Sequence, residues 1–306
     1  MMLGVVLFDG TLNNRLNVPE GGRQTIVAHL YERLQGNPSI EFIKYYPGVG
    51  TQSLPIRAAI DAATGYTLKE TAERAADKVI VSIEKMRKAT PEIDVRLLVS
   101  GFSRGGAAAR HFMNVLEQRW EDEVIRGTPP HFYAVIFDTV ATGQREALSL
   151  QVPALADMFY HFTSINERRV FFKPIFDIPQ STEYSRITTF RMPGAHSDVG
   201  ASYSAGVGLE YLANVDALLS GMGLLPQQCF TVEGDARSQG KNDSRWLLEQ
   251  GLGIGAPDTK DEPSYRTSFH LHAEPLPINF WPEWNRRMLS LESWVHRITA
   301  ALWTAR

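Results

Sequence analysis

The residues with the clearest chemical meaning form the stretch Gly101-Phe102-Ser103-Arg104-Gly105. It follows an apolar run, VRLLVS, and precedes an alanine-rich segment, GAAARHF, so a strand, a sharp turn and a helix are expected in succession. Glycines two positions before and after a serine are typical of a nucleophile elbow, whose crowded turn presents the serine hydroxyl at a helix N-terminus. Ser103 is therefore the expected nucleophile.

A serine nucleophile needs a histidine to take its proton and a carboxylate to hold the histidine in the right tautomer. In chains with this elbow the order is serine, then acid, then histidine. The spacing permits Asp138 with His196, and it equally permits Asp198 with His270. The residues alone leave both pairs open.

A second polar motif, Asp9-Gly10-Thr11, follows the first apolar run of the chain. Phosphatases with an aspartyl nucleophile begin in the same way, but they carry another aspartate two positions earlier, where this chain has Leu7. A leucine side chain cannot attack phosphorus. The motif therefore disfavours phosphatase chemistry and calls for another role.

That role is expected to be an oxyanion hole, which needs two N–H groups aimed at the developing negative charge. One donor is the backbone N–H of Arg104, after the nucleophile, and the other is that of Gly10 or Thr11. In this interpretation Asp9 fixes the loop through hydrogen bonds to neighbouring amides. The plainer interpretation is a tight turn around a buried carboxylate.

The elements that position these residues follow from the hydrophobic pattern. Short β-branched runs alternate with longer helical patterns, which predicts a mainly parallel sheet covered by helices. Strands are expected at Leu3–Phe8, Phe42–Tyr46, Val95–Ser100, Tyr133–Phe137 and Thr188–Met192. A helix is expected where Ala72, Ala75, Val79, Ile83 and Met86 recur at helical spacing, and another is expected after Arg104.

Composition limits the class of protein. With 306 residues, 43% of them hydrophobic, and no linker-like segment, a single domain over 1–306 is expected, with a variable loop around 232–244. The net charge of −3 offers no basic surplus for binding nucleic acid. The single Cys229 allows neither an internal disulfide nor a thiolate zinc site. No signal-peptide pattern or membrane-length apolar run is found, so synthesis in the cytoplasm is expected.

Six motifs between Val5 and about Tyr203 occur in a characteristic order: FDGTLNN, YYPGVGT, GFSRGGAAAR, FDTVATG, SINERRVFF and PGAHSDVGASY. Together they resemble the family of uncharacterised α/β-hydrolase domains that includes the first group of type VI secretion lipase effectors. The resemblance implies an α/β-hydrolase-like fold with a mainly parallel central sheet, flanking helices and inserted lid-like loops. It also implies a phospholipase of the A type, delivered by bacteria to hydrolyse a competitor's membrane lipids.

The same resemblance implies a triad of Ser103, Asp198 and His270. Asp198 is the acid of the GAHSDVG segment, and His270 stands in a later short strand. His272 stands where the family usually has a serine, so His272 and His196 remain alternatives for the base.

Under this assignment Asp138, like His196, is a supporting hydrogen-bonding group or an alternative catalytic one. The chain departs from the family at Asn166, where an acidic residue is expected. Acyl transfer by such a triad needs no metal and no other cofactor.

A lipid substrate requires an apolar acyl channel and a surface that tolerates the edge of a bilayer. The aromatic residues around 151–180 suit a lid insertion and a core equally, and the amphipathic LESWVHRITAALW segment suits packing on its own domain better than membrane contact. The expected partners are a phospholipid, a membrane surface in transient contact, an immunity protein and a component of the secretion apparatus. The alternatives are a soluble carboxylesterase for small esters and a non-catalytic binding module of the same fold.

Overall fold

The computed structural model describes residues 1–18, 22–51, 61, 64–122, 127–169, 172–178, 186–204 and 206–226, and the backbone of 269–272. Its central layer is a parallel six-stranded sheet of order β2-β1-β3-β4-β5-β7. The strands are β1 (Met2–Phe8), β2 (Phe42–Tyr46), β3 (Val95–Phe102), β4 (His131–Phe137), β5 (Ala156–Ser164) and β7 (Ile187–Met192). The expected α/β class with a mainly parallel sheet is confirmed.

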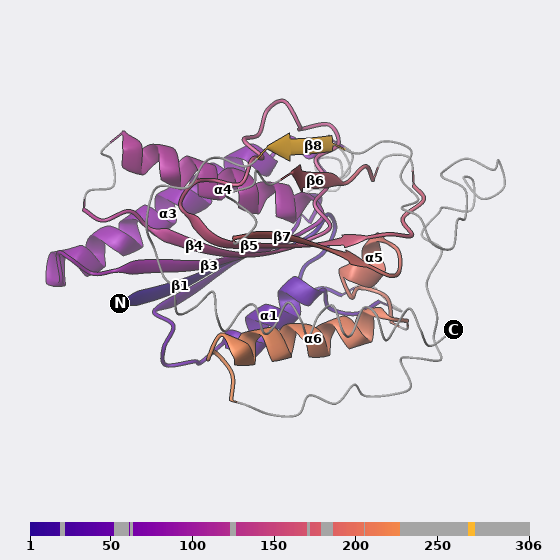
Figure 1. Cartoon of the computed structure of the whole chain (residues 1–306), viewed down its shortest axis with the longest axis horizontal. Coiled ribbons are helices and arrows are strands. Elements are labelled where there is room, and N and C mark those ends of the chain that lie inside the picture. The colour runs from indigo at the N-terminus through magenta and orange to yellow at the C-terminus, as the bar shows by residue number, and fades with distance from the viewer. Residues whose placement is uncertain are drawn as a thin grey trace.

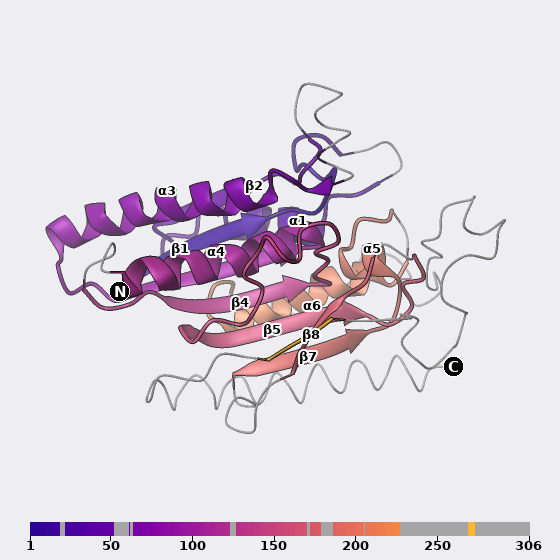
Figure 2. The same ribbon diagram turned by 90° about the horizontal axis from the view of Figure 1, so that it is seen from above.

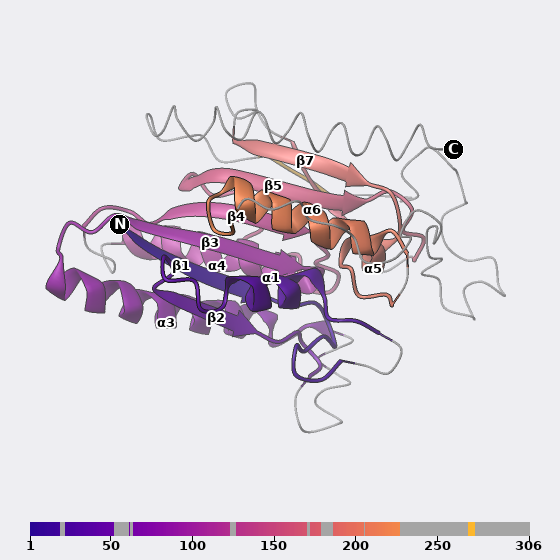
Figure 3. The ribbon, with the colours of Figure 1, turned by 90° about the horizontal axis from the view of Figure 1, so that it is seen from below.

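Helices cover both faces of this sheet (Figure 1). On one face lie α3 (Leu68–Ala89) and α4 (Arg104–Glu121), and on the other lie α1 (Ile26–Leu34) and α6 (Gly208–Gly221), which are seen side by side in Figure 3. Successive residues of a strand point to opposite faces. Val6 of β1 therefore packs in the α3–α4 cluster, while Val5 and Leu7 pack in the α1–α6 cluster.

The helix α3 forms where the apolar spacing predicts it. Ala72, Ala75, Val79 and Ile83 are buried, and Met86 packs partly buried against the same cluster. The second expected helix is α4, which begins at Arg104 directly after the end of β3.

The order of the strands reverses between β1 and β3. From β1 the chain passes to β2 on one side of the sheet and then returns to β3 on the other side, from which β4, β5 and β7 follow outward (Figure 2). In open parallel sheets, ligands bind outside the carboxyl ends of the strands at such a reversal. The loop after β1, with Asp9, and the turn after β3, with Ser103, meet at this place.

A second, two-stranded sheet lies on the side of α4, formed by β6 (Ile175–Ile178) and β8 (Phe269–His272) in parallel (Figure 1). An ion pair connects this sheet to α4. The carboxylate of Asp177 in β6 lies 2.7 Å from Nη2 of Arg110 in α4, and both side chains are fully buried. Burial alone raises the pKa of Asp177, but the Arg110 guanidinium outweighs it and holds that pKa well below its usual range.

The segment around 151–180, which suited a lid insertion in the sequence analysis, includes a strand of the central sheet. Residues 156–164 form β5, a buried strand of the central sheet, so the lid interpretation is wrong for them. The aromatic residues of this strand are buried in the core of the domain, and their pattern in the sequence suits an inserted lid equally well. The variable loop at 232–244 and the LESWVHRITAALW segment lie outside the described residues.

Candidate active site

The turn around Ser103 is a sharp elbow between β3 and α4. Ser103 has φ 59° and ψ −127°, a conformation that residues other than glycine rarely adopt. A Cβ atom on Gly101 would stand 2.3 Å from the carbonyl oxygen of Gly105, and one on Gly105 would stand 2.2 Å from that of Phe8. Neither position has room for a side chain, so both glycines are required. The buried Ser103 has a strained backbone conformation.

The turn after β4 is hydrogen-bonded to this elbow. Ser103 N donates to the carbonyl oxygen of Phe137 at 3.0 Å, and Val140 N donates to that of Ser103 at 3.2 Å. Asp138, which follows Phe137 in the sequence, is fully buried. Its carboxylate accepts hydrogen bonds from Ser164 N at 2.9 Å and Ser164 Oγ at 2.8 Å. The acid is thus held beside the serine in one orientation.

The carboxylate of Asp138 is paired with His196, the first residue of α5 (His196–Val199). Its Nδ1 lies 2.6 Å from Asp138 Oδ2. An ionised carboxylate only accepts hydrogen bonds, so this contact assigns the proton to Nδ1 and leaves Nε2 without it. The imidazole contacts the rings of Phe102 and Phe172, with centroid distances of 4.6 Å and 4.9 Å.

A buried carboxylate that the sequence analysis missed, Glu167, holds the backbone of this histidine. Its Oε2 accepts a hydrogen bond from His196 N at 3.1 Å, and Arg169 pairs with the same carboxylate at 3.0 Å. The preceding Asn166 accepts a hydrogen bond from Gly194 N at 2.9 Å. Position 166, where the resemblance leads one to expect an acid, thus holds an amide that binds the Gly194 backbone, and the neighbouring Glu167 supplies a buried carboxylate.

Asp198, the acid implied by the family pattern, lies in the same short helix as His196. It is fully buried, and its Oδ2 accepts a hydrogen bond from Ala195 N at 2.8 Å, which closes the turn at the start of α5. The backbones of His270 and His272 pair with Phe176 and Ile178 of β6. The side chains of these two histidines lie outside the described part of the structure. Among the described side chains, Ser103 is thus accompanied by Asp138 and His196.

The loop after β1 packs directly on the elbow, because the carbonyl groups of Phe8 and Asp9 border Gly105. Of the two N–H groups expected as oxyanion donors, that of Gly10 donates to Asp9 Oδ1 at 2.7 Å. The Thr11 N–H has no acceptor among the residues that the structure describes. The Gly10 N–H is thus already engaged by the Asp9 carboxylate.

Asp9 is the buried centre of this loop. Besides the Gly10 amide, its carboxylate accepts hydrogen bonds from Thr25 Oγ1 at 2.8 Å and from Tyr45 Oη at 2.5 Å. Burial raises the pKa of Asp9 from 3.8 to about 6, although the three donors act in the opposite direction. Arg104 crosses to the same loop, where its Nη1 donates to Thr11 Oγ1 at 3.1 Å.

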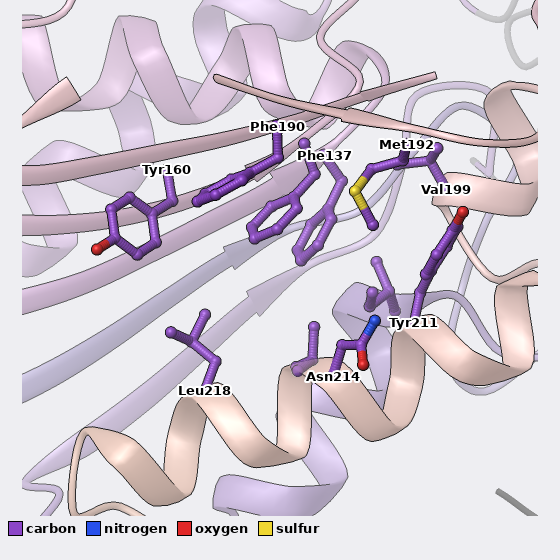
Figure 4. A pocket seen from close by; sticks show the side chains of 11 residues that line it. Phe137, Tyr160, Phe190, Met192, Val199, Tyr211, Asn214 and Leu218 are labelled. Atoms are coloured by element: carbon purple, nitrogen blue, oxygen red, sulfur yellow. The ribbon is translucent and has the colours of Figure 1, made fainter. Parts of the chain in front are cut away.

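A small apolar pocket lies between the sheet and α6, on the same side of the sheet as the ring of Phe102 (Figure 4). Aromatic and aliphatic side chains line it, among them Phe137, Phe190 and Met192 from the strands, Val199 from α5, and Val215 and Leu218 from α6. We refer to it as the α6 pocket. Within the described ranges, no cluster of three or more His, Cys, Asp or Glu side chains could hold a metal ion, and no helix is long and apolar enough to cross a membrane.

Residues 4–119 match the model of a family described as the catalytic domain of Tle1-like phospholipase effectors of the type VI secretion system. The matched segment contains the Asp9 loop, the Ser103 elbow and three of the six motifs, FDGTLNN, YYPGVGT and GFSRGGAAAR, and it confirms the resemblance over this part of the chain. No curated protein matches the chain.

Two solved structures are similar to this chain. One is the Tle1 effector bound to the VgrG spike of the type VI secretion system, with 22% identity and a TM-score of 0.46 over 67% of this chain. The other is an uncharacterised protein from Pseudomonas aeruginosa, with 19% identity and a TM-score of 0.48 over 76%. This chain spans about half the length of each, 52% and 48%.

Proposed function

We propose that this relative of the Tle1-like phospholipase effectors is a serine hydrolase that cleaves acyl esters of membrane glycerophospholipids, as a phospholipase of the A type. The observation that carries the proposal is the 2.6 Å hydrogen bond between His196 Nδ1 and Asp138 Oδ2, next to the Ser103 elbow. Their chain order, serine, acid, histidine, is that of α/β-hydrolases.

In the proposed reaction, His196 Nε2 takes the proton of Ser103 Oγ while the oxygen attacks the ester carbonyl carbon. The bond from that carbon to the glycerol oxygen breaks, and His196 returns the proton to the departing alcohol. A water molecule, deprotonated by the same imidazole, then releases the fatty acid from Ser103. Asp138 orients the ring and stabilises the imidazolium that forms in each step.

The negative oxygen of each tetrahedral intermediate is assigned to the backbone N–H groups of Arg104 and Thr11. The support is the contact of the β1 loop with Gly105, which brings the two segments together. Each donor in such a site contributes on the order of 10²–10³ in rate.

The pair that the family pattern implies, Asp198 with His270, remains the competing assignment. We favour Asp138 with His196 because the hydrogen bond between them is already formed and because Ser103 is hydrogen-bonded to the turn that carries Asp138. In our proposal Asp198 closes the turn that presents His196.

The test is fatty-acid release from phosphatidylethanolamine and phosphatidylglycerol vesicles by the wild type and by Ser103→Ala. Release that disappears in the variant supports the proposal. Serine-dependent hydrolysis of short esters without release from vesicles would instead identify a soluble carboxylesterase. Failure of a fluorophosphonate probe to label Ser103, together with no ester hydrolysis, would identify a binding module of the same fold.

We also propose a component of the secretion apparatus as a partner. The Tle1 effector has been solved bound to the VgrG spike, and the family match extends that idea to this chain. Delivery by type VI secretion accords with the same match, and an immunity protein is a further proposed partner. Co-purification of the chain with a spike protein from the same genome tests the first of these partners.

A further inference from the structure

We propose that His161 is a positioning residue for the active site. Its Nε2 holds the backbone of Thr139, and this contact keeps the neighbouring Asp138 in the orientation in which it pairs with His196. The inference rests on the proposed function, in which Asp138 is the catalytic acid, and it adds a buried residue that acts through this acid.

Asp138 has a backbone conformation that the surrounding structure must hold. Its φ is 38°, in the left-handed region that residues other than glycine seldom adopt. Such a conformation persists only where neighbouring contacts enforce it. On the N-terminal side of Asp138, the carbonyl oxygen of Phe137 accepts a hydrogen bond from Ser103 N, so the elbow holds that side. On the C-terminal side the next residue is Thr139.

Three elements hold Thr139, which is fully buried. Its N–H donates to Nε2 of His161 in β5 at 3.1 Å, and its carbonyl oxygen accepts from Ile175 N in β6 at 3.1 Å. Its hydroxyl accepts from Nε of Arg110 in α4 at 3.3 Å. The N–H belongs to the peptide unit that joins Asp138 to Thr139. His161 therefore fixes the plane of that unit and, with it, the ψ angle of the acid.

The surroundings of His161 leave Nε2 without a proton, as this hydrogen bond requires. A backbone N–H can only donate, so the proton of the neutral ring stands on Nδ1. That nitrogen lies 3.3 Å from Asp177 Oδ2, which accepts from it. Complete burial lowers the pKa of His161, and the positive charge of Arg110 acts in the same direction. The neutral ring is therefore the favoured form.

His161 lies on the face of the sheet that α4 covers, opposite the α6 pocket. Its neighbour Phe162 lines that pocket, and successive residues of a strand point to opposite faces. The imidazole of His161 is fully buried, with no access to solvent. It therefore acts on the site through the groups that it contacts, and Thr139 is the one that adjoins the acid.

Two substitutions separate the roles of the two ring nitrogens. In His161→Gln the side-chain oxygen can replace Nε2 and accept from Thr139 N, whereas in His161→Asn the amide can replace only the donor at Nδ1. We expect His161→Asn to lower kcat for p-nitrophenyl butyrate by about tenfold or more and to keep KM within about threefold, because a small misplacement of a catalytic group slows the reaction. His161→Gln is expected to keep kcat within about threefold of the wild type.

The matched control is His131→Asn. His131 also pairs with an aspartate, Asp157, but it stands at the start of β4, at the other end of the strand from Asp138. We expect this variant to keep the kcat of the wild type. Titration of Ser103 with a fluorophosphonate probe counts the reactive sites in each preparation, so kcat refers to folded protein alone.

A double variant tests whether the effect passes through Asp138. Once Asp138→Asn has removed the carboxylate, its orientation no longer matters. We therefore expect Asp138→Asn/His161→Asn to have the same kcat as Asp138→Asn alone. A further loss of about tenfold in the double variant would mean that His161 acts on another part of the site, and it would overturn the proposal.

The other outcomes separate this inference from the function on which it rests. Unchanged kcat in His161→Asn, or an equal loss in His161→Gln, would overturn the positioning role and leave the hydrolase intact. Full activity in Asp138→Asn would do the same. If the wild type hydrolyses no ester in a Ser103-dependent way, the proposed function fails and the positioning role fails with it. If His161→Asn does not fold, His161→Leu replaces it, since leucine also lacks an acceptor, and the same loss is expected.

Discussion

The position of His196 is restricted by four described residues. The rings of Phe102 and Phe172 contact its imidazole, Asp138 accepts from Nδ1, and Glu167 accepts from the backbone N–H. These contacts limit the orientations that the side chain can adopt. Such preorganisation is what a general base requires, because a small misplacement of the base lowers the rate steeply.

We expect His196→Ala to lower kcat for p-nitrophenyl butyrate by about 10⁴-fold or more, because the general base is lost. His270→Ala, the matched control, is expected to stay within a few-fold of the wild type. Steady-state kinetics of the two purified variants make the comparison. The opposite result, with activity lost in His270→Ala and kept in His196→Ala, would move the base to β8 and the acid to Asp198.

A second prediction at the residue scale concerns the buried Asp9. Its pKa is raised from 3.8 to about 6 in the folded protein, so the folded state binds the proton more tightly than the unfolded state does. Protonated Asp9 therefore contributes up to about 3 kcal/mol to the free energy of unfolding. This contribution is fully present below about pH 4 and is lost as the pH rises through about 6.

Asp9→Asn removes this titration. We therefore expect the free energy of unfolding of the wild type, minus that of the variant, to fall between pH 4 and pH 6 and then to level off. Urea unfolding at a series of pH values measures the difference. A difference that rises with pH over this window would mean that the hydrogen bonds from Thr25 and Tyr45 outweigh the effect of burial.

The residue types in the sequence indicated which groups could form a catalytic site, but not which acid pairs with which histidine. Ser103 and both acid–histidine pairs could be named from the elbow and the chain order. The choice between Asp138 and Asp198 could not be made, because it depends on which strand ends lie next to each other, and spacing along the chain does not encode that. Glu167 was missed for a similar reason, since its partner His196 is 29 residues away in sequence.

At the scale of elements, the ion pair between α4 and β6 joins the two sheets. Arg110 Nη1 and Nη2 lie 2.8 Å and 2.7 Å from the two oxygens of Asp177, and Arg110 also donates to the carbonyl oxygen of Leu150. Removing one member of a buried pair leaves the other charge uncompensated. The helix that begins at the elbow therefore depends on β6 for its stability.

We expect Arg110→Met to destabilise the protein by about 3–5 kcal/mol, because the Asp177 carboxylate is then buried without its cation. The double variant Arg110→Met/Asp177→Leu is expected to recover part of that loss, since no charge remains. Urea unfolding of the wild type and the two variants provides the values. Equal loss in the single and double variants would show that the guanidinium acts through its other hydrogen bonds instead.

The elements themselves were largely predictable. The strand expected at Phe42–Tyr46 has the observed bounds, and the other four expected strands differ from the observed ones by one or two residues at an end. The strands β5 and β6 and the helices α1, α5 and α6 were not expected. The aromatic residues of β5 suited a lid as well as a core, and a short apolar run does not distinguish the two by periodicity alone.

At the scale of the whole molecule, the site lies where the strand order reverses. In our proposal the oxyanion loop follows β1, the nucleophile follows β3 and the acid follows β4, and these three strands are neighbours in the sheet. The proposed base, His196, comes from α5, after the edge strand β7. The sequence predicted parallel strands, but it did not predict this order, which depends on long-range pairing.

The contact between Gly105 and the carbonyl groups of Phe8 and Asp9 has a consequence for how such sequences evolve. A side chain at position 105 would push the opening loop away from the elbow, and a bulkier loop would push the elbow away in turn. Selection therefore acts on two motifs nearly a hundred residues apart as if they were one. Descendants of this chain are expected to keep the glycine and the Asp-Gly-Thr loop together or to lose both.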